Sequence, residues 1–327
     1  MGLTRTDPPL LSVLVLNYNY ARFLPQCLDS ILSQTFEDFE LIVIDDCSTD
    51  ESREALNRYA GRPRVTVVNH ETNQGWVKSL IEGTEQRSRG EFLSVVSADD
   101  FALEPTAFAR QLAAIRTEPG VVACVTAFLK LGPGAERAER HPLRGEDVLD
   151  GHEFIRRQLC DREAGLLHSG TIIRASAYRA GGGYRAGLSN YLDLAMWLDL
   201  GYQGSVAYLD EPFYAYRIHD SQLSGSAARR RLVLREGIDL LRSAAAKASA
   251  NGIPVTEAGV LRVRIADLAL ADAFANRRIG GLLRCWDALL LQPRAAFTSS
   301  GWWLALIRSL AGRGGWRVLV RVRRFLP

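Results

Sequence analysis

The stretch Glu91-Phe-Leu-Ser-Val-Val-Ser-Ala-Asp-Asp-Phe101 is a run of β-forming residues that ends in two adjacent carboxylates, Asp99 and Asp100. Their charges repel each other, and burying them without partners would be costly. A hard divalent cation bound together with phosphate would relieve that cost, because Mg²⁺ prefers carboxylate and phosphate oxygens as ligands. The alternative is a strand end followed by an Asp-rich helix cap. The sequence around the stretch favours the cation.

Strands and helices alternate on both sides of this stretch, through the first 130 residues. Strands are predicted at 12–16, 40–45, 64–69, 91–96 and 121–129, and helices at 24–34, from 48 onward, at 75–87 and at 108–116. This order predicts an α/β fold with a doubly wound, mainly parallel sheet and helices on both faces. Ligands of such sheets bind outside the carboxyl ends of the strands.

Polar residues stand at three of these strand ends. They are Asn17-Tyr18-Asn19, Asp45-Asp46 and Asp99-Asp100. Because the carboxyl ends of parallel strands share one edge of a sheet, we expect these groups to meet in one cleft. An aromatic ring can stack on a base, one acid can accept a hydrogen bond from a base N–H, and an acid pair can hold a metal with a diphosphate. Together they predict a nucleotide site.

Several separated segments of the chain resemble the family 2 glycosyltransferases, which have the GT-A fold. The segments are Ser12–Asn19, Leu28–Phe36, Glu40–Asp50, Asn73–Gly75, Arg89–Glu91 and Ser97–Asp100. The resemblance covers roughly residues 10–225, and it is specific because the segments agree in order and spacing. It implies a metal-dependent hexosyltransferase-like enzyme of bacterial cell-surface polysaccharide synthesis.

The resemblance implies a donor site at the matching positions. Tyr18, between Asn17 and Asn19, would lie near the nucleotide base. Asp46 would accept a hydrogen bond from a uracil-type ring nitrogen. Lys78 would reach the diphosphate or the sugar, with an exposed lysine as the simpler alternative. UDP is the expected nucleotide, and dTDP and GDP remain open.

The resemblance also implies a site for Mg²⁺ or Mn²⁺. Asp100 would ligate the metal, and Asp99 would contact ribose or diphosphate and share the metal. His219 would complete metal or phosphate binding, unless it is a structural histidine, and Arg217 would balance phosphate charge, unless it is solvated. Ser97 replaces an acid that is common in the family. The metal would therefore be held mainly through phosphate and water.

Asp193 precedes Trp197 by four residues, as the general base does in the family's acidic segment. The acid that usually comes just before it is replaced by Leu192. Burial beside Leu192, Leu194 and Trp197 would raise the pKa of Asp193, a useful direction for a base. The alternative is a helix cap, with Trp197 in the core. Acceptor contacts are expected from Trp197 and from His168.

The expected reaction is an inverting transfer of a sugar from a nucleotide-sugar donor to a hydroxyl of a saccharide or lipid-linked acceptor, in polysaccharide or glycolipid synthesis. A nucleotidyltransferase or a dinucleotide-binding dehydrogenase would want a glycine-rich loop after the first strand, and residues 17–23 contain no glycine. A catalytically inactive nucleotide-sugar-binding scaffold stays open, because acids are missing at positions 97 and 192.

Charge divides the 327 residues into two parts. Residues 226–327 carry 18 Lys and Arg against 6 Asp and Glu, a net of +12, which leaves a net of −9 for residues 1–225. We therefore predict a catalytic domain at 1–225, with a nucleotide-sugar-binding half at 1–130 and an acceptor-binding half at 131–225. Within the second half, residues 132–151 are Gly-, Glu- and Arg-rich and predict an exposed loop.

The basic region 226–327 predicts helices at 229–250, 255–277 and 281–291. Arginines interleaved with Trp302, Trp303 and Trp316 suit an interfacial helix on an anionic membrane. The alternative is a helical bundle with solvated arginines. No nucleic-acid recognition motif accompanies the charge, so binding to nucleic acid is not expected.

Localisation is predicted from three observations. Residues 1–9 show no signal peptide, and no run of about 18 apolar residues exists to span a bilayer. The five cysteines are widely spaced and fit neither a zinc site nor a redox motif, which predicts reduced thiols. We expect a cytoplasmic protein, peripheral at the inner face of the membrane if the basic region binds lipid.

Overall fold

The structure is a computed structural model of the chain, and it forms two compact units. The first comprises residues 1–154 and 165–225, and the second residues 155–164 and 226–327. The residues that the structure describes are 7–132, 135–139, 148–161, 168–188, 191–219, 230–261, 263, 285, 286, 289, 302, 303, 305–307, 309 and 310.

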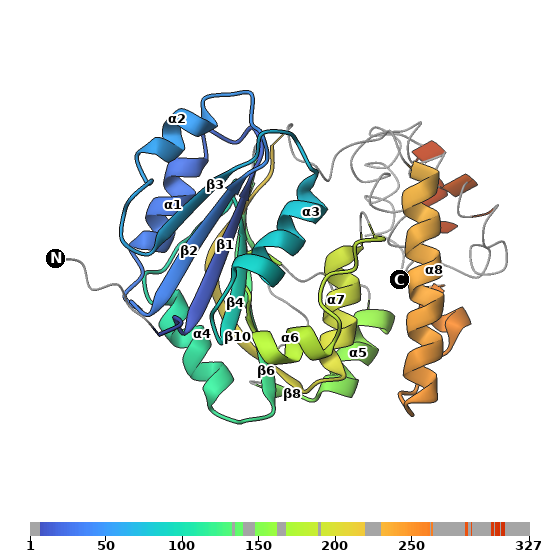
Figure 1. Cartoon of the computed structure of the whole chain (residues 1–327). Coiled ribbons are helices and arrows are strands. Elements are labelled where there is room, and N and C mark those ends of the chain that lie inside the picture. Colours follow the sequence, from blue (N-terminus) through green and yellow to red (C-terminus); the bar gives the residue numbers. More distant parts are fainter. Residues whose placement is uncertain are drawn as a thin grey trace. The chain divides into compact units, whose positions relative to one another are not determined.

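The first unit is built on one curled, mostly parallel sheet (Figure 1). Its strands are β1 (Leu11–Asn17), β2 (Phe39–Asp45), β3 (Val65–Asn69), β4 (Phe92–Ser97), β5 (Phe101–Ala102), β6 (Val121–Gly132), β7 (Ala135–Glu139), β8 (Val148–Leu149), β9 (Ile172–Arg174) and β10 (Ser205–Arg217). The spatial order is β3-β2-β1-β4-β9-β6-β10-β5, with β7 beside β6 and β8 beside β10. Strands β3, β2, β1 and β4 run parallel, as do β6 and β10, whereas β9 is antiparallel to both of its neighbours.

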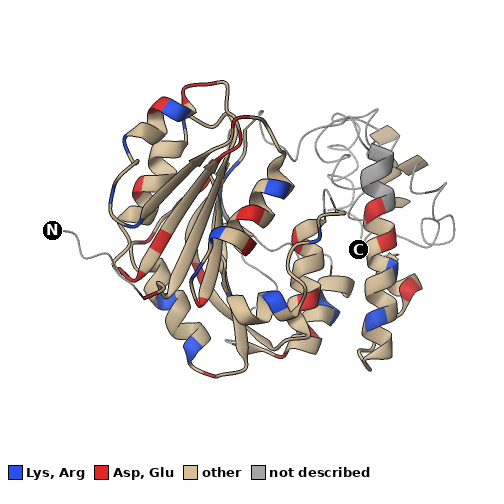
Figure 2. Ribbon diagram, viewed as in Figure 1, with Lys and Arg blue, Asp and Glu red and all other residues tan. Residues whose placement is uncertain are grey.

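Helices cover both faces of this sheet, as the alternation of elements predicts. They are α1 (Leu24–Leu32), α2 (Ser52–Asn57), α3 (Trp76–Ile81), the π-helix η1 (Glu82–Arg87), α4 (Ala107–Arg116), α6 (Ala175–Ala180) and α7 (Leu192–Gly201). A further helix, α5 (Gly151–Cys160), begins in the first unit, and its residues from 155 onward belong to the second. Charged residues lie on the helices and at strand ends, and the middles of the central strands are free of charge (Figure 2). The predicted fold class is confirmed.

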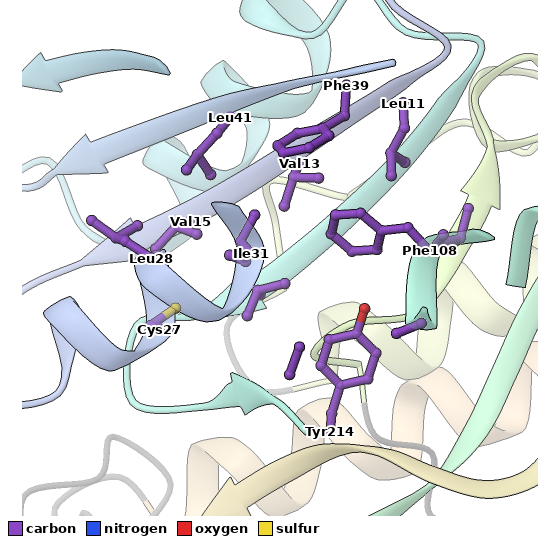
Figure 3. Close-up of a cluster of buried hydrophobic side chains, with 14 of the residues drawn as sticks. Leu11, Val13, Val15, Cys27, Leu28, Ile31, Phe39, Leu41, Phe108 and Tyr214 are labelled. Carbon is purple, nitrogen blue, oxygen red and sulfur yellow. The ribbon is translucent and has the colours of Figure 1, made fainter. Parts of the chain in front are cut away.

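Two hydrophobic clusters meet at β1, because successive side chains of a strand point to opposite faces. Val13 and Val15 pack with Leu28 and Phe108 against α1, α2 and α4 (Figure 3). Leu14 belongs to the other cluster, with side chains of α3, α6 and α7. Burying one such Val, Leu or Phe side chain contributes about 1.5–3 kcal/mol, so β1 is held from both sides.

The amino edge of the sheet is closed by a polar network. Ser12 Oγ donates to Glu40 Oε1 over 2.7 Å and accepts from the Gly90 N–H over 2.8 Å. The Arg89 guanidinium donates twice to Glu40 Oε2, over 3.1 and 2.8 Å. A Cβ at position 90 would come within 2.6 Å of Ser12 N, so only glycine fits there. The Arg89–Glu91 segment is thus structural, and the opposite edge is left for ligands.

Two elements differ from prediction. Residues 132–151 were expected to form an exposed loop, but β7 pairs antiparallel with the end of β6, and β8 with β10. β7 (Ala135–Glu139) pairs through its backbone and has a sequence without apolar alternation, and β8 has only two residues, too few to show a period. The single helix predicted at 75–87 is divided into α3 and η1. A π-turn is not visible in residue periodicity, and such turns often mark functional sites.

The second unit contains α8 (Arg230–Ala250), which confirms the first predicted helix of the basic region. One side of α8 is buried, including Ile238, Leu241, Ala245 and Ala248. The helices predicted at 255–277 and 281–291 lie largely outside the described residues. Among the described residues, no helix has both the length and the apolar character needed to cross a membrane.

Candidate functional site

Strand register brings the predicted polar residues together at the carboxyl edge. Asn17 pairs with Asp45 across β1 and β2, and Asp45 pairs with Asn69 across β2 and β3. On the other side of β1, Leu16 pairs with Ser97, just before the two acids. The segments that follow these strands therefore emerge side by side, which is the convergence that the sequence predicts.

Asn17 and Asn19 hold this edge in shape. Asn17 Nδ2 donates to Asp45 Oδ1 over 2.7 Å, and Asp45 is fully buried. Asn19 has a positive φ of 60°, and its Oδ1 accepts from the Thr49 N–H over 2.7 Å. Between them, the Tyr18 side chain is 39% exposed. The two asparagines are therefore engaged with the protein, whereas the Tyr18 ring is exposed.

Asp46 lies just beyond β2 and is held by three donors. Its Oδ1 accepts from His70 Nδ1 and from the Gln74 N–H, each over 2.9 Å, and its Oδ2 accepts from the Gly75 N–H over 2.8 Å. Gly75 has φ +89°, a conformation that glycine adopts without strain. Burial alone would raise the pKa of Asp46, but the hydrogen bonds from His70 and the two backbone N–H groups lower it overall.

His70 is a site residue that the sequence analysis did not identify. Its Nε2 lies 3.0 Å from Glu82 Oε2, so the imidazole stands between two carboxylates. Arg87 Nε donates to the other oxygen of Glu82 over 2.6 Å. The sequence offers one indication of this role. His70 directly follows the third predicted strand, so it lies at the same edge of the sheet as the predicted polar residues.

Asp100 is 1% exposed, and its two oxygens differ. Oδ1 accepts from the Arg217 N–H over 3.1 Å, whereas Oδ2 is buried and has no hydrogen-bond partner among the described residues. Burial and the neighbouring charge of Asp99 raise the pKa of Asp100 to about 7, although hydrogen bonds from Ser169 and the Arg217 N–H oppose the shift. The orphaned oxygen marks a place where a cation would be stabilising.

Asp99 is joined to the end of β10. Its Oδ2 lies 3.0 Å from His219 Nε2, and its backbone oxygen accepts from Arg217 Nη1 over 2.9 Å. The His219 ring packs at 4.7 Å from the ring centroid of Phe23, and the Arg217 guanidinium lies 4.5 Å from that of Phe101. Residues far apart in sequence, from β4 and β10, therefore form one acidic cluster with two basic neighbours.

The residues at this edge fit a divalent cation held jointly with a ligand. Asp100 Oδ2 is an unused carboxylate oxygen, and Asp99 is adjacent. No group of three or more His, Cys, Asp or Glu side chains within the described part of the chain is arranged to hold a metal by itself. Mg²⁺ and Mn²⁺ sites of one or two carboxylates take their remaining ligands from phosphate and water. The expectation drawn from Ser97, that phosphate and water hold most of the metal, stays a prediction.

Asp193 lies in the first turn of α7, and its side chain is exposed. The burial expected beside Leu192 and Trp197 is wrong, because α7 turns these two side chains into the core and Asp193 outward. Trp197 is 2% exposed and packs against Phe154, so it is a core residue rather than an acceptor contact. Asp193 Oδ1 accepts from the Leu194 N–H over 2.8 Å.

His168 lies near Asp193, and it directly precedes Ser169, which contacts Asp100. Burial lowers the pKa of His168, and the negative charge of nearby Asp193 opposes that shift. His168 Nε2 lies 2.5 Å from the hydroxyl of Tyr184, another residue that sequence reasoning missed. The next residue, Ser169, contacts Asp100 and accepts from the Ser97 N–H over 3.0 Å. Lys78 is exposed on α3, just after Gly75.

Comparison with known proteins agrees with this geometry. Residues 12–182 match the profile of Glycosyl transferase family 2. The chain is 26% identical over 220 residues to a chondroitin synthase of Pasteurella multocida, covering 66% of this chain and 21% of that protein. It is also 26% identical over 226 residues to the putative glycosyltransferase EpsH of Bacillus subtilis, covering 66% and 63% of the two chains. The chain thus spans about a fifth of the synthase and less than two thirds of EpsH.

Solved structures share the fold. S. aureus TarS 1-349, in complex with UDP-GlcNAc, superposes with a TM-score of 0.63 at 17% identity, covering 91% of this chain and 88% of that one. The mannosyltransferase PcManGT from Pyrobaculum calidifontis, in complex with GDP-Man and Mn²⁺, superposes with a TM-score of 0.52 at 18% identity, covering 93% and 87%. The architecture is GT-A.

Proposed function

The chain belongs to glycosyl transferase family 2, and from this premise we propose that it transfers a sugar from a UDP-sugar to an acceptor hydroxyl with inversion at the anomeric carbon. One observation carries the proposal. Asp100 Oδ2 is buried without a partner among the described residues, at the edge where Asp46 and Asp99 also lie. A diphosphate with its cation is the ligand that such an edge would stabilise.

The donor's base is recognised by Asp46. An ionised carboxylate accepts about four hydrogen bonds, and three are already made by His70, Gln74 and Gly75. The remaining position, on Oδ2, suits a ring N–H, which uracil, thymine and guanine carry. Cytosine N3 and adenine N1 are acceptors and would be repelled. Tyr18 offers its exposed ring to stack on the base.

The diphosphate would lie at Asp99 and Asp100, where Asp100 would hold Mg²⁺ or Mn²⁺ with support from Asp99 and His219. The chemistry that such a cation supplies when bound is neutralisation of charge on the leaving diphosphate. Arg217 is fixed beside Asp99, where its guanidinium adds positive charge. Lys78 reaches the same edge from α3. Two proteins of the same fold support binding of a nucleotide-sugar: PcManGT is in complex with GDP-Man and Mn²⁺, and TarS with UDP-GlcNAc.

Asp193 accepts the proton of the acceptor hydroxyl. That oxygen then forms a bond to the anomeric carbon as the bond from this carbon to the diphosphate breaks on the opposite side, which inverts the configuration. The exposure of Asp193 leaves its carboxylate accessible to a saccharide or a lipid-linked acceptor. His168 contributes to the acceptor side, since it lies near Asp193 and next to Ser169 of the cation site.

A thermal-shift experiment tests the donor site. UDP with Mn²⁺ is expected to raise the melting temperature by about 5–10 °C, because ligand at a hundred times its Kd stabilises the native state by about 2.7 kcal/mol. EDTA should remove most of the shift, and CDP should give a smaller one. The proposal is overturned if none of UDP, dTDP and GDP, with or without Mn²⁺, moves the transition.

The catalytic domain is residues 1–225, with a nucleotide-sugar-binding half at 1–130 and an acceptor-binding half at 131–225. The basic region 226–327 rests on an anionic membrane surface, where a lipid-linked acceptor of polysaccharide synthesis is found. The exposed side chains of Trp286, Trp303, Ile307 and Leu310 support the membrane contact, whereas Trp302 is buried. Trp316 lies outside the described residues.

Vesicle flotation tests the membrane contact. Four arginines near the end of the chain, Arg317, Arg321, Arg323 and Arg324, are replaced together by Gln. Each arginine near an anionic surface contributes about 1 kcal/mol, so the fraction bound to phosphatidylserine vesicles should fall about tenfold or more. Vesicles of phosphatidylcholine alone are the control. Equal flotation of both proteins on the anionic vesicles would exclude this surface.

A further inference from the structure

We infer that His70 is a positioning residue for base recognition, which rests on the function proposed above. It is the only side chain among the three donors that hold Asp46, since Gln74 and Gly75 act through backbone N–H groups. Its imidazole is buried. Nδ1 lies 2.9 Å from Asp46 Oδ1, and Nε2 lies 3.0 Å from Glu82 Oε2.

The donors of Asp46 determine which of its lone pairs is left for the ligand. His70 and Gln74 both occupy Oδ1, so this oxygen has little remaining capacity. Gly75 occupies one side of Oδ2. Without His70 the carboxylate would be held by backbone groups alone, both from the same short segment, and its plane would be free to tilt. His70 therefore fixes the orientation of Oδ2 toward the base.

The outer side of His70 is itself anchored. His70 Nε2 lies 3.0 Å from Glu82 Oε2, and Arg87 donates to the other oxygen of Glu82. The backbone is fixed too, because the His70 N–H donates to Asp45 O over 2.9 Å and Arg53 Nη2 donates to His70 O over 2.8 Å. Glu82 opens the π-helix η1, so an element outside the donor site orients a residue inside it.

A purely structural histidine would join the segment after β3 to η1 without affecting base choice. The two roles can be separated because amide side chains imitate one imidazole nitrogen at a time. The amide nitrogen of Asn has the position of Nδ1, two bonds from Cβ, and that of Gln has the position of Nε2, three bonds from Cβ. His70→Asn therefore keeps the donor to Asp46, and His70→Gln keeps the donor to Glu82.

The experiment measures Kd for UDP and for CDP, each with Mn²⁺, in the full-length protein and both variants, with melting temperatures alongside. The ratio of the two Kd values reports base recognition, which general loosening of the structure would not change. A hydrogen bond to a charged group is worth about 1.5–3 kcal/mol, so the wild-type ratio should favour UDP by about tenfold or more. His70→Asn should keep that ratio, and His70→Gln should bring it close to one. Asp46→Asn is the positive control, because its amide can also donate to cytosine.

Equal ratios in the two His70 variants, whether kept or lost, would overturn the inference. If His70→Gln does not fold, Glu82→Ala is the second variant, with an expected fall in the ratio of about threefold; an unchanged ratio there would also overturn it. A wild-type protein that binds no nucleoside diphosphate would instead contradict the proposed function, and one that binds UDP and CDP equally would contradict the role of Asp46.

Discussion

Asp193→Asn is expected to lower kcat for sugar transfer by about 10²–10⁴-fold, the usual contribution of a general base. The Asn side chain has the same shape but cannot take the proton of the acceptor hydroxyl. Since Asp193 lies in the first turn of α7 and none of the donor-side residues bonds to it among the described contacts, the Kd of UDP should stay within about twofold. Transfer rates and UDP binding are measured on the same preparation.

The chain offers a matched control for this substitution. Glu54 is also an exposed acid in the first turn of a short helix, α2. Glu54→Gln removes the same helix-terminal charge and should leave kcat unchanged. A variant at Asp193 that transfers sugar at nearly the wild-type rate would show that another group takes the proton. Loss of UDP binding in that variant would show that Asp193 belongs to the donor site.

Asp100→Asn is expected to reduce metal-dependent transfer by about 10²–10³-fold, because a cation contributes several kcal/mol of charge stabilisation at the leaving group. The same change should stabilise the metal-free protein. The pKa of Asp100 is raised to about 7 by burial and by Asp99, whereas an unfolded Asp titrates near 3.9. The folded state therefore binds the proton more tightly, and the unfolding free energy of the wild type falls as pH rises from about 4 to 7.

Melting temperatures measured in EDTA at several pH values test the direction of this pH dependence. Asn cannot ionise, so the melting temperature of Asp100→Asn should exceed that of the wild type by a margin that grows up to about pH 7. The pKa of Asp50 is shifted in the opposite direction from that of Asp100. Burial would raise the pKa of Asp50, but hydrogen bonds from Ser52 and the Ala21 N–H lower it overall, so Asp50→Asn should destabilise the protein at neutral pH. A lower melting temperature for Asp100→Asn at pH 8 would contradict the account.

The fold and the acidic edge were predictable because they depend on local patterns. The apolar runs predict β1, β2 and β4, and the position of Asp46, Asp99 and Asp100 just after two of these strands predicts them as site residues. The contacts that orient these acids were not predictable. His70, His219 and Arg217 lie at the ends of other strands. Only the three-dimensional pairing of the strands shows which acid each of them contacts.

The exposure of Asp193 and the burial of Trp197 show a second limit. Both residues belong to one mostly apolar helix, in which nearly every position after the first turn is buried. Periodicity cannot identify the exposed side of such a helix, so the environment of Asp193 required the packing of α7. The π-turn at Glu82 was hidden for a related reason, since it changes the backbone hydrogen bonding without changing the residue pattern.

The position of β1 between two hydrophobic clusters has a consequence for local unfolding. Local opening of either layer leaves β1 packed by the other, so this strand should belong to the last part of the molecule to unfold. Asn17 at its end, which donates to Asp45, should then stay in place when either layer opens.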